Sequence, residues 1–361
     1  MKWSWRIGRI LGIDLHIHAT FLLAVAWGAA TGYREGGTVA AAASGVAFIL
    51  AVFASVVLHE LGHALAARRY GVGTRDIVLL PIGGVARLER MPEEPRQELV
   101  IALAGPAVTA AIVAALYAVL RVTGASASLH EALAGGSLLA QLMSANVVLL
   151  LFNLLPAFPM DGGRVLRALL AMRMDYVRAT SIAAAIGKAF ALLFGVFGYF
   201  KLQSPILVIV ALFVWMGAAA EASAIETRSA LGGVPVHRVM ISDVRTVSPA
   251  DTLARAVDYI LAGFQQDFPV VADGRVVGVL TRAELLKALA QHGRDTTVAE
   301  VMQRDFQTTE PWEPLDRAFA RLQGCRCQTL PVVRAGELVG VLTQENVGEF
   351  LMVQAALKGR A

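Results

Sequence analysis

Long apolar runs without ionisable residues dominate the first two thirds of the chain. No Asp, Glu, Lys or Arg occurs in residues 15–33, 36–58, 99–120, 132–160 and 202–220. A sixth apolar run, residues 180–200, is interrupted once, by Lys188. Because a helix needs about 20 apolar residues to cross a bilayer, the pattern predicts six membrane-spanning helices, with the fourth near residues 137–157 and the sixth near 204–224.

The remainder of the chain has a soluble pattern that repeats after 62 residues. Val-Met, Pro-Val-Val and Gly-Val-Leu-Thr motifs begin at residues 239, 269 and 278, and again at 301, 331 and 340. Each copy reads as a helix, a strand, a short turn, a second strand and a helix. One copy is too small to bury much apolar surface alone. We therefore expect one paired module, with domains at residues 1–225, 235–290 and 297–355 and a linker at 226–234.

The charge of the chain divides at the same place. Residues 1–231 contain 31 Asp, Glu, Lys and Arg residues, and residues 232–361 contain 29 in little more than half that length. The first part has a net charge of +5 and the second of −1. A nucleic-acid binder would concentrate basic residues on a polar domain, so no nucleic-acid partner is expected. The two cysteines, Cys325 and Cys327, are too few for a disulfide scaffold.

The basic residues also predict the orientation in the membrane. Three Lys and Arg residues precede the first predicted span, six lie between the second and third, and four lie between the fourth and fifth. The alternate loops hold one each, namely Arg34, Arg121 and Lys201. By the positive-inside rule, the chain is expected to be a multi-pass protein of the cell membrane with its N- and C-termini in the cytoplasm.

The most informative chemistry lies at the end of the predicted second span, which reads His59-Glu60-Leu61-Gly62-His63. Two histidines four residues apart project from one face of a helix and suit two ligands of one zinc ion. Glu60 could take a proton from an attacking water and pass it to a leaving amine. A carboxylate in the bilayer costs on the order of 3 kcal/mol and is rarely retained without a function. The alternative is a solvated cluster at a helix end.

Asp161 is the expected third ligand, because it follows 29 residues without charge. The second and fourth predicted spans both run from outside to inside, so their ends lie at similar depth near the cytoplasmic face. Pro156, Pro159 and two glycines break the helix there. A broken backbone at membrane depth requires surrounding protein or a water-filled cavity. Without the histidines, an Asp that caps the next helix would be the preferred interpretation.

Together these motifs resemble the site-2 protease family of intramembrane zinc metalloproteases, over residues 1–225. The resemblance rests on the His-Glu-Leu-Gly-His motif and on Asn-Leu-Leu-Pro followed by Asp-Gly. It implies that His59, His63 and Asp161 hold zinc and that Glu60 is the catalytic acid and base. It also implies that Asn153 positions the substrate or the oxyanion, although Asn153 could instead satisfy backbone groups freed by the prolines.

The segment after the second predicted span, residues 76–89, is rich in β-branched residues and contains Gly83 and Gly84. In the family this region forms a small sheet whose edge binds substrate. A transmembrane helix must unwind before its peptide bonds can be attacked, and pairing with a sheet edge replaces the lost hydrogen bonds. A plain hairpin on the membrane surface is the alternative. In the third span, Gly105 is expected to permit close helix packing.

The two soluble repeats resemble paired cystathionine-β-synthase (CBS) domains, which form an α+β unit that binds adenine nucleotides and is often dimeric. The resemblance points to Thr281 and Thr343 as nucleotide-binding positions. Nucleotide-binding members place an Asp three residues later, where this chain has Glu284 and Asn346. The module is therefore either a nucleotide sensor or a structural, dimerising unit.

These features predict an α-helical polytopic membrane domain of six transmembrane helices, with a small β-sheet after the second, and a soluble α+β tandem CBS module. The predicted function is an intramembrane zinc endopeptidase with one zinc ion per chain, embedded in the lipid bilayer and acting on membrane-embedded protein substrates. An adenine nucleotide and a homodimer through the CBS pair are the other expected partners. The rival class is a CBS-regulated membrane metal-ion transporter, but a carrier gains little from an unliganded Glu60 between its ligands.

Overall fold

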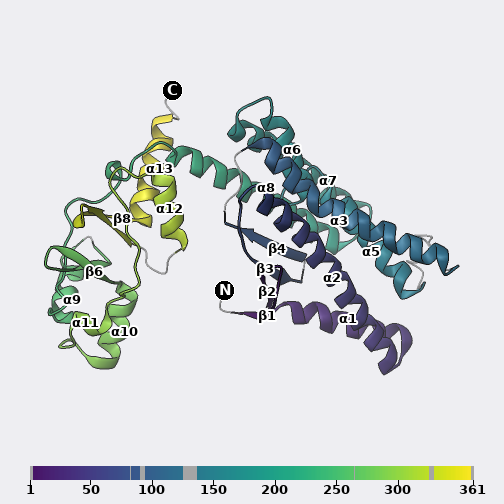
Figure 1. The fold of residues 1–361 in the computed structure, drawn as a ribbon, viewed down its shortest axis with the longest axis horizontal. Coiled ribbons are helices and arrows are strands. Elements are labelled where there is room, and N and C mark those ends of the chain that lie inside the picture. Colours follow the sequence, from purple (N-terminus) through teal and green to yellow (C-terminus); the bar gives the residue numbers. More distant parts are fainter. Residues whose placement is uncertain are drawn as a thin grey trace. The chain divides into compact units, whose positions relative to one another are not determined.

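The computed structural model describes residues 3–81, 83–89, 94–124, 136–263, 265–324 and 329–358, and Cys325 and Cys327 lie outside these ranges. The chain divides into two compact units, Met1–Ser223 and Ala224–Ala361 (Figure 1). Helix α8 (Pro205–Leu231) contains the boundary between them. The first residues of the predicted linker, 226–231, are therefore helical.

The first unit is mainly helical and contains long apolar helices. Within the described ranges, four helices are long and apolar enough to cross a membrane: α2 (Val39–Arg69), α3 (Pro95–Val122), α7 (Tyr176–Phe200) and α8. The same described ranges hold three shorter helices, namely α1 (Phe21–Gly36), α5 (Leu138–Asn153) and α6 (Asp161–Ala171). The chain therefore has the apolar helices of a membrane protein.

The first predicted span begins too early. Residues 13–18 form a strand rather than a helix, and α1 begins only at Phe21. Ile13 and Leu15 are buried and alternate with the partly buried Asp14 and His16, which is the period of two typical of a strand. A search for long stretches without charge cannot separate such a strand from the helix that follows it.

A four-stranded sheet covers part of α2. Its strands are β1 (Ser4–Ile10), β2 (Ile13–His18), β3 (Thr74–Leu80) and β4 (Gly83–Leu88), in the order β1-β2-β3-β4. Strands β2 and β3 are parallel, and the other pairs are antiparallel. Two strands thus lie in the segment after α2, and the two from the N-terminal segment were not predicted. Strand β4 is an edge strand and runs beside α2 (Figure 1).

Small residues allow the helices of the first unit to approach closely. A Cβ atom on Gly45 of α2 would lie 2.1 Å from the carbonyl oxygen of Gly28 on α1. About two turns further along the same two helices, the rings of Phe21 and Phe53 meet edge to face, with centroids 4.6 Å apart. Close backbone approach through small residues is typical of helix pairs in membranes.

The second unit contains the two repeats around one sheet of order β5-β6-β8-β7. Its strands are β5 (Phe268–Ala272), β6 (Arg275–Leu280), β7 (Thr329–Arg334) and β8 (Glu337–Thr343). Its helices are α9 (Leu253–Leu261), α10 (Arg282–His292), α11 (Val298–Val301), α12 (Leu315–Gly324) and α13 (Gln344–Lys358), with a short 3-10 turn, Val236–Arg238.

The two repeats exchange their leading segments. Ile241, before the first repeat's strands, pairs with Val341 on β8 of the second repeat. The equivalent residue of the second repeat, Gln303, pairs with Val279 on β6 of the first. Their backbone N–H groups donate hydrogen bonds of 2.9 and 2.9 Å to the facing carbonyls. The copies therefore form one interlocked module, as their individual size predicted.

Candidate metal centre

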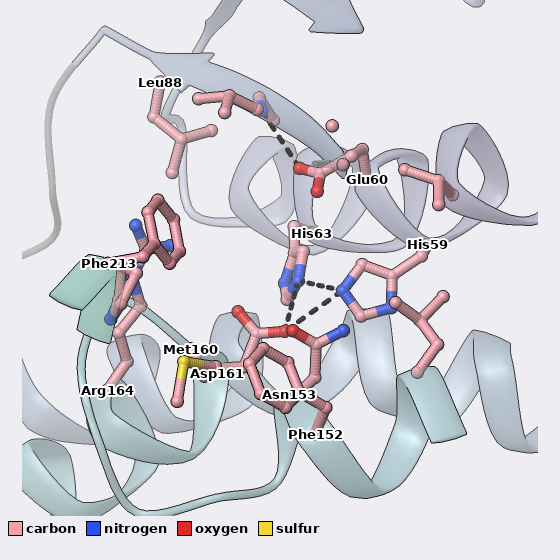
Figure 2. A pocket seen from close by; sticks show the side chains of 17 residues that line it. His59, Glu60, His63, Leu88, Phe152, Asn153, Met160, Asp161, Arg164 and Phe213 are labelled. Atoms are coloured by element: carbon pink, nitrogen blue, oxygen red, sulfur yellow. Dashed lines mark hydrogen bonds and ion pairs between the residues drawn. The ribbon is translucent and has the colours of Figure 1, made fainter. Parts of the chain in front are cut away.

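Two helices bring three buried ligand side chains to one point. His59 and His63 lie one turn apart on α2, and Asp161 is the first residue of α6. Asp161 Oδ2 lies 3.0 Å from His59 Nε2 and 3.1 Å from His63 Nε2, and the two Nε2 atoms are 3.1 Å apart (Figure 2). All three residues are more than nine-tenths buried. The predicted convergence of the two histidines with Asp161 is therefore present in the structure.

This donor set fits a zinc ion. A tetrahedral ion with bonds of about 2.0 Å separates its donor atoms by about 3.3 Å, close to the separations of 3.0–3.1 Å found here. Two histidines and one carboxylate are a typical ligand set of catalytic zinc, which keeps a fourth position open. Within the described part of the chain, no other group of three or more His, Cys, Asp or Glu side chains converges in this way.

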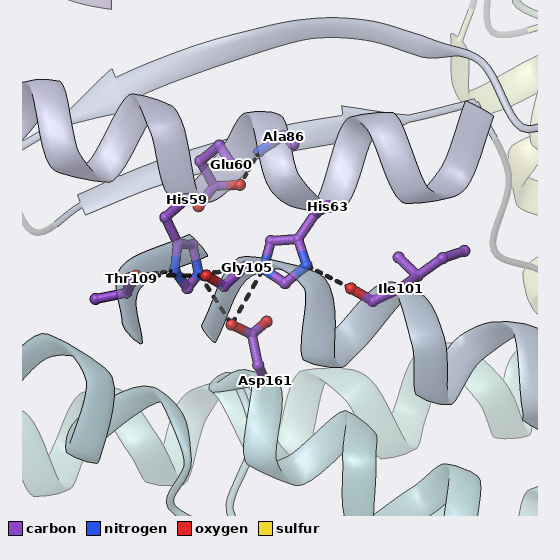
Figure 3. A network of polar contacts seen from close by, with 8 residues as sticks. All are labelled: His59, Glu60, His63, Ala86, Ile101, Gly105, Thr109 and Asp161. Carbon is purple, nitrogen blue, oxygen red and sulfur yellow. Dashed lines mark hydrogen bonds and ion pairs between the residues drawn. The ribbon is translucent and has the colours of Figure 1, made fainter. Parts of the chain in front are cut away.

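Contacts on the far side of each imidazole orient the ring, and for His63 the contact also selects the tautomer that a metal needs. His63 Nδ1 donates to the carbonyl oxygen of Ile101 over 2.7 Å, which leaves the Nε2 lone pair for the ion. His59 Nδ1 is bonded to Thr109 Oγ1 at 2.8 Å. Both partners belong to α3 (Figure 3). Such outer contacts orient metal-binding imidazoles and raise their basicity.

Gly105 of α3 lies directly against the ligand pair. A Cβ atom at this position would lie 2.2 Å from His63 Nε2 and 2.7 Å from His59 Nε2. Close helix packing at Gly105 is therefore present, and the residues that pack against it are the two candidate ligands, His59 and His63. Ile101 and Thr109, which lie four residues before and four residues after Gly105, were not predicted from the sequence.

Glu60 lies beside the ligands without joining them. Its Oε2 atom accepts a hydrogen bond of 2.9 Å from the backbone N–H of Ala86 on the edge strand β4 (Figure 3). Gly84 of the same strand sits over the Glu60 side chain, since a Cβ there would lie 2.8 Å from Glu60 Cγ. The carboxylate is therefore placed between the metal ligands and an edge strand.

A cavity of about 280 Å³ joins these groups. Its walls include the candidate metal ligands, the catalytic candidate and the three substrate-positioning candidates: His59, Glu60, His63, Gly83, Gly84, Asn153 and Asp161. The remaining walls are largely apolar, with Phe152 and Phe213 among them, and Arg164 adds a cation (Figure 2). The cavity therefore combines a metal site, an acid or base and a wall with an exposed strand edge.

The Arg164 guanidinium lies near the Asp161 carboxyl and favours its ionised form, which is the form that binds a divalent cation.

The structure leaves two other histidines outside this site. His18 Nδ1 is bonded to Thr20 Oγ1 at 2.8 Å, and His16 Nδ1 lies 4.0 Å from Asp76. Lys188 places its ammonium group 5.8 Å from the ring centroid of Trp215. None of these residues lines the cavity.

The four candidate nucleotide-binding residues begin two equivalent helices of the second unit. Thr281 Oγ1 accepts from the backbone N–H of Glu284 at the start of α10, and Thr343 Oγ1 accepts from that of Asn346 at the start of α13. Each hydroxyl also contacts the side chain of its partner. Glu284 additionally accepts a hydrogen bond of 2.7 Å from Gln303. All four residues are therefore in corresponding places, as the repeat requires.

Comparison with known proteins agrees with this geometry. Residues 47–194 match the family model described as Peptidase family M50, and residues 236–291 and 298–352 match the CBS domain. Zinc metalloprotease MJ0392 of Methanocaldococcus jannaschii is 33% identical over 347 residues, which cover 96% of each chain. The Mycobacterium tuberculosis protein Rip3 is 30% identical over 96% of this chain and 92% of its own. The solved site-2 protease from M. jannaschii is 38% identical with a TM-score of 0.45, covering 61% of this chain and 95% of that one.

The fold and the site define a membrane metalloprotease with an appended CBS pair. The chain belongs to peptidase family M50, the zinc metalloproteases of the site-2 type, and it carries two CBS domains.

Proposed function

We propose that this protein hydrolyses a peptide bond in or near the transmembrane segment of a membrane-embedded protein, close to the cytoplasmic face. One observation carries the proposal: the buried ligand set of His59, His63 and Asp161 shares a cavity with the Glu60 carboxylate, which ligates nothing. A hydrolase needs such a carboxylate, whereas a metal-ion carrier does not.

The residues around the cavity have separate roles in this reaction. Zinc held by His59, His63 and Asp161 would polarise the scissile carbonyl and lower the pKa of a water molecule. Glu60 accepts the proton of the attacking water and returns it to the leaving amine. Asn153 lines the same cavity and can donate its amide N–H to the oxygen on which negative charge develops.

Strand β4 supplies the place where the substrate backbone binds. It is the last strand of the sheet, and Gly83 and Gly84 have no side chains to obstruct an approaching backbone. A substrate stretch that has unwound from its helix can pair with this edge and recover its hydrogen bonds. Because Ala86 already points its N–H toward Glu60, a paired substrate would lie beside the acid and base.

The proposed membrane topology has six spans with both termini in the cytoplasm. Helices α1 and α5 would add two spans to the four long helices. Each has 16 residues and is about 24 Å long, so flanking residues complete the crossing of a core of about 30 Å. The alternation of loops that hold several Lys and Arg residues with loops that hold one supports this arrangement. The proposed domains are residues 1–225, 235–290 and 297–355, joined by 226–234.

The proposed function can be tested in cells by comparing membrane proteomes. A strain that carries the Glu60→Gln variant should accumulate at least one single-span membrane protein that the wild-type strain cleaves. A cytoplasmic fragment of the same protein should be present only in the wild type. Identical membrane proteomes in the two strains would remove the support for an intramembrane substrate.

We further propose that the CBS pair binds an adenine nucleotide, assembles as a homodimer and modulates proteolysis. Full-length protein in nanodiscs is expected to bind AMP or ATP in calorimetric titrations. Thr281→Ala and Thr343→Ala should each weaken binding about tenfold, as expected for one lost hydrogen bond. Thr296→Ala, a partly exposed position in the same unit, is the control. If neither nucleotide gives a binding signal, the module is structural.

A further inference from the structure

A fully buried arginine lies behind the metal centre. The Arg167 side chain of α6 has no exposed surface, and it is bonded to Glu98 of α3 and Glu221 of α8. Arg167 Nε donates to Glu98 Oε1 over 2.8 Å. The rings of Phe158 and Tyr176 flank the guanidinium, with centroids 5.0 and 5.1 Å from its central carbon. Three helices far apart in sequence therefore meet at one cation.

Stability does not explain this cluster by itself. Removing charges from water is expensive, and buried ion pairs can often be replaced by apolar residues without loss of stability. Glu98 is almost as buried as Arg167, whereas the Glu221 side chain keeps 30% of its surface exposed. A buried network of this kind favours the arrangement of its helices in which the charges are paired, since separating them leaves a buried charge without a partner.

The cluster and the metal centre share one face of α3. Glu98, Ile101, Gly105 and Thr109 follow each other at intervals of three, four and four residues, which places them along a single side of the helix. Ile101 orients His63, Thr109 orients His59, and Gly105 lies against both (Figure 3). The remaining member, Glu98, is bonded to Arg167 of α6.

Helix α6 carries the third ligand at its first position. Gly162 allows the start of α6 to pack against the preceding loop, because a Cβ at this position would lie 2.2 Å from the carbonyl oxygen of Leu155. Arg167, six residues after Asp161, is the point at which α6 is bonded to α3. One face of α3 therefore contacts two ligands directly, and this ion pair joins it to the helix that carries the third.

We propose that Arg167 is a positioning residue, which holds α6 against α3 and thereby keeps the Asp161 carboxylate at bonding distance from the two imidazoles. Glu221 adds a second anchor from α8. The proposal rests on the zinc site of the proposed function and adds the residues that set its geometry.

The test measures zinc affinity, independently of proteolysis. Full-length variants in nanodiscs would be titrated against a chelator of known zinc affinity, and their melting temperatures recorded. Arg167→Met is expected to weaken zinc binding between about tenfold and a hundredfold, the usual effect of losing an outer contact. Arg167→Lys keeps the charge but loses the planar, multidentate guanidinium, so its zinc affinity should lie between that of Arg167→Met and that of the wild type. Arg173→Met, at an exposed position just beyond α6, is the matched control.

Two further variants separate positioning from folding. The triple change Arg167→Met, Glu98→Gln and Glu221→Gln removes every charge of the cluster, so the melting temperature should recover while zinc affinity stays low. The milder Glu221→Gln should fold and weaken zinc binding a few-fold, with the exposed Glu226→Gln on the same helix as its control. Wild-type zinc affinity in the triple variant would overturn the proposal. If the wild type itself bound no zinc, the proposed function would fail instead.

Discussion

Glu60→Gln is expected to abolish peptide hydrolysis while the protein keeps its zinc. Glutamine has the same shape, and its side-chain oxygen can still accept the hydrogen bond from the Ala86 N–H. It cannot take up a proton at neutral pH, so the loss should be at least 10²-fold and up to about 10⁴-fold in turnover. The measurement is the rate at which purified full-length protein cleaves a single-span peptide in nanodiscs, together with its zinc content.

The comparison with a distant carboxylate makes this result specific. Glu35→Gln, at the exposed end of α1, changes the net charge equally and should leave both turnover and zinc content unchanged. Undiminished cleavage by Glu60→Gln would refute the role of Glu60 as acid and base. A variant that loses its zinc would instead make Glu60 part of the ligand set, against the geometry around Asp161.

The convergence of His59, His63 and Asp161 could be predicted from the sequence because their signals are local or chemically extreme. His59 and His63 are separated by one helical turn, and their common direction follows from helix geometry alone. Asp161 is conspicuous as a charge after a long apolar run. The positive-inside rule gives the second and fourth predicted spans the same direction. Their ends are therefore expected at the same membrane depth, which is why Asp161 was predicted to lie near the two histidines.

The parts that escaped prediction depend on tertiary contacts. Thr109 and the Ile101 carbonyl act only because α3 packs against α2, and neither residue type signals a function in an apolar helix. The short strand at Ile13–His18 overlaps the start of a charge-free apolar run, so its residues were assigned to the first predicted span. Its partner in the sheet, β3, lies some 60 residues later, and no local pattern specifies that parallel pairing.

Gly105→Ala is expected to eliminate zinc binding, although the change adds only one methyl group. Alanine is preferred to glycine in a helix by about 1 kcal/mol, so local propensity alone would favour the variant. Its Cβ would lie 2.2 Å from His63 Nε2, far below any van der Waals contact. The ring cannot simply turn away, because its other nitrogen is bonded to the Ile101 carbonyl. Zinc affinity should fall more than about a hundredfold, and hydrolysis should fall with it.

Gly195→Ala is the matched control, because it is the same change in another apolar helix, at a position where the added methyl group fits without a clash. A Cβ at Gly195 of α7 would lie 3.5 Å from Ala211 Cβ, an ordinary contact, so this variant should keep its zinc and melt at or above the wild-type temperature. Metal analysis and chelator titration of both variants distinguish a local clash from a general effect of glycine replacement. One zinc per chain at wild-type affinity in Gly105→Ala would mean that the imidazoles can move apart without losing the ion, which contradicts the close packing of α3 against them.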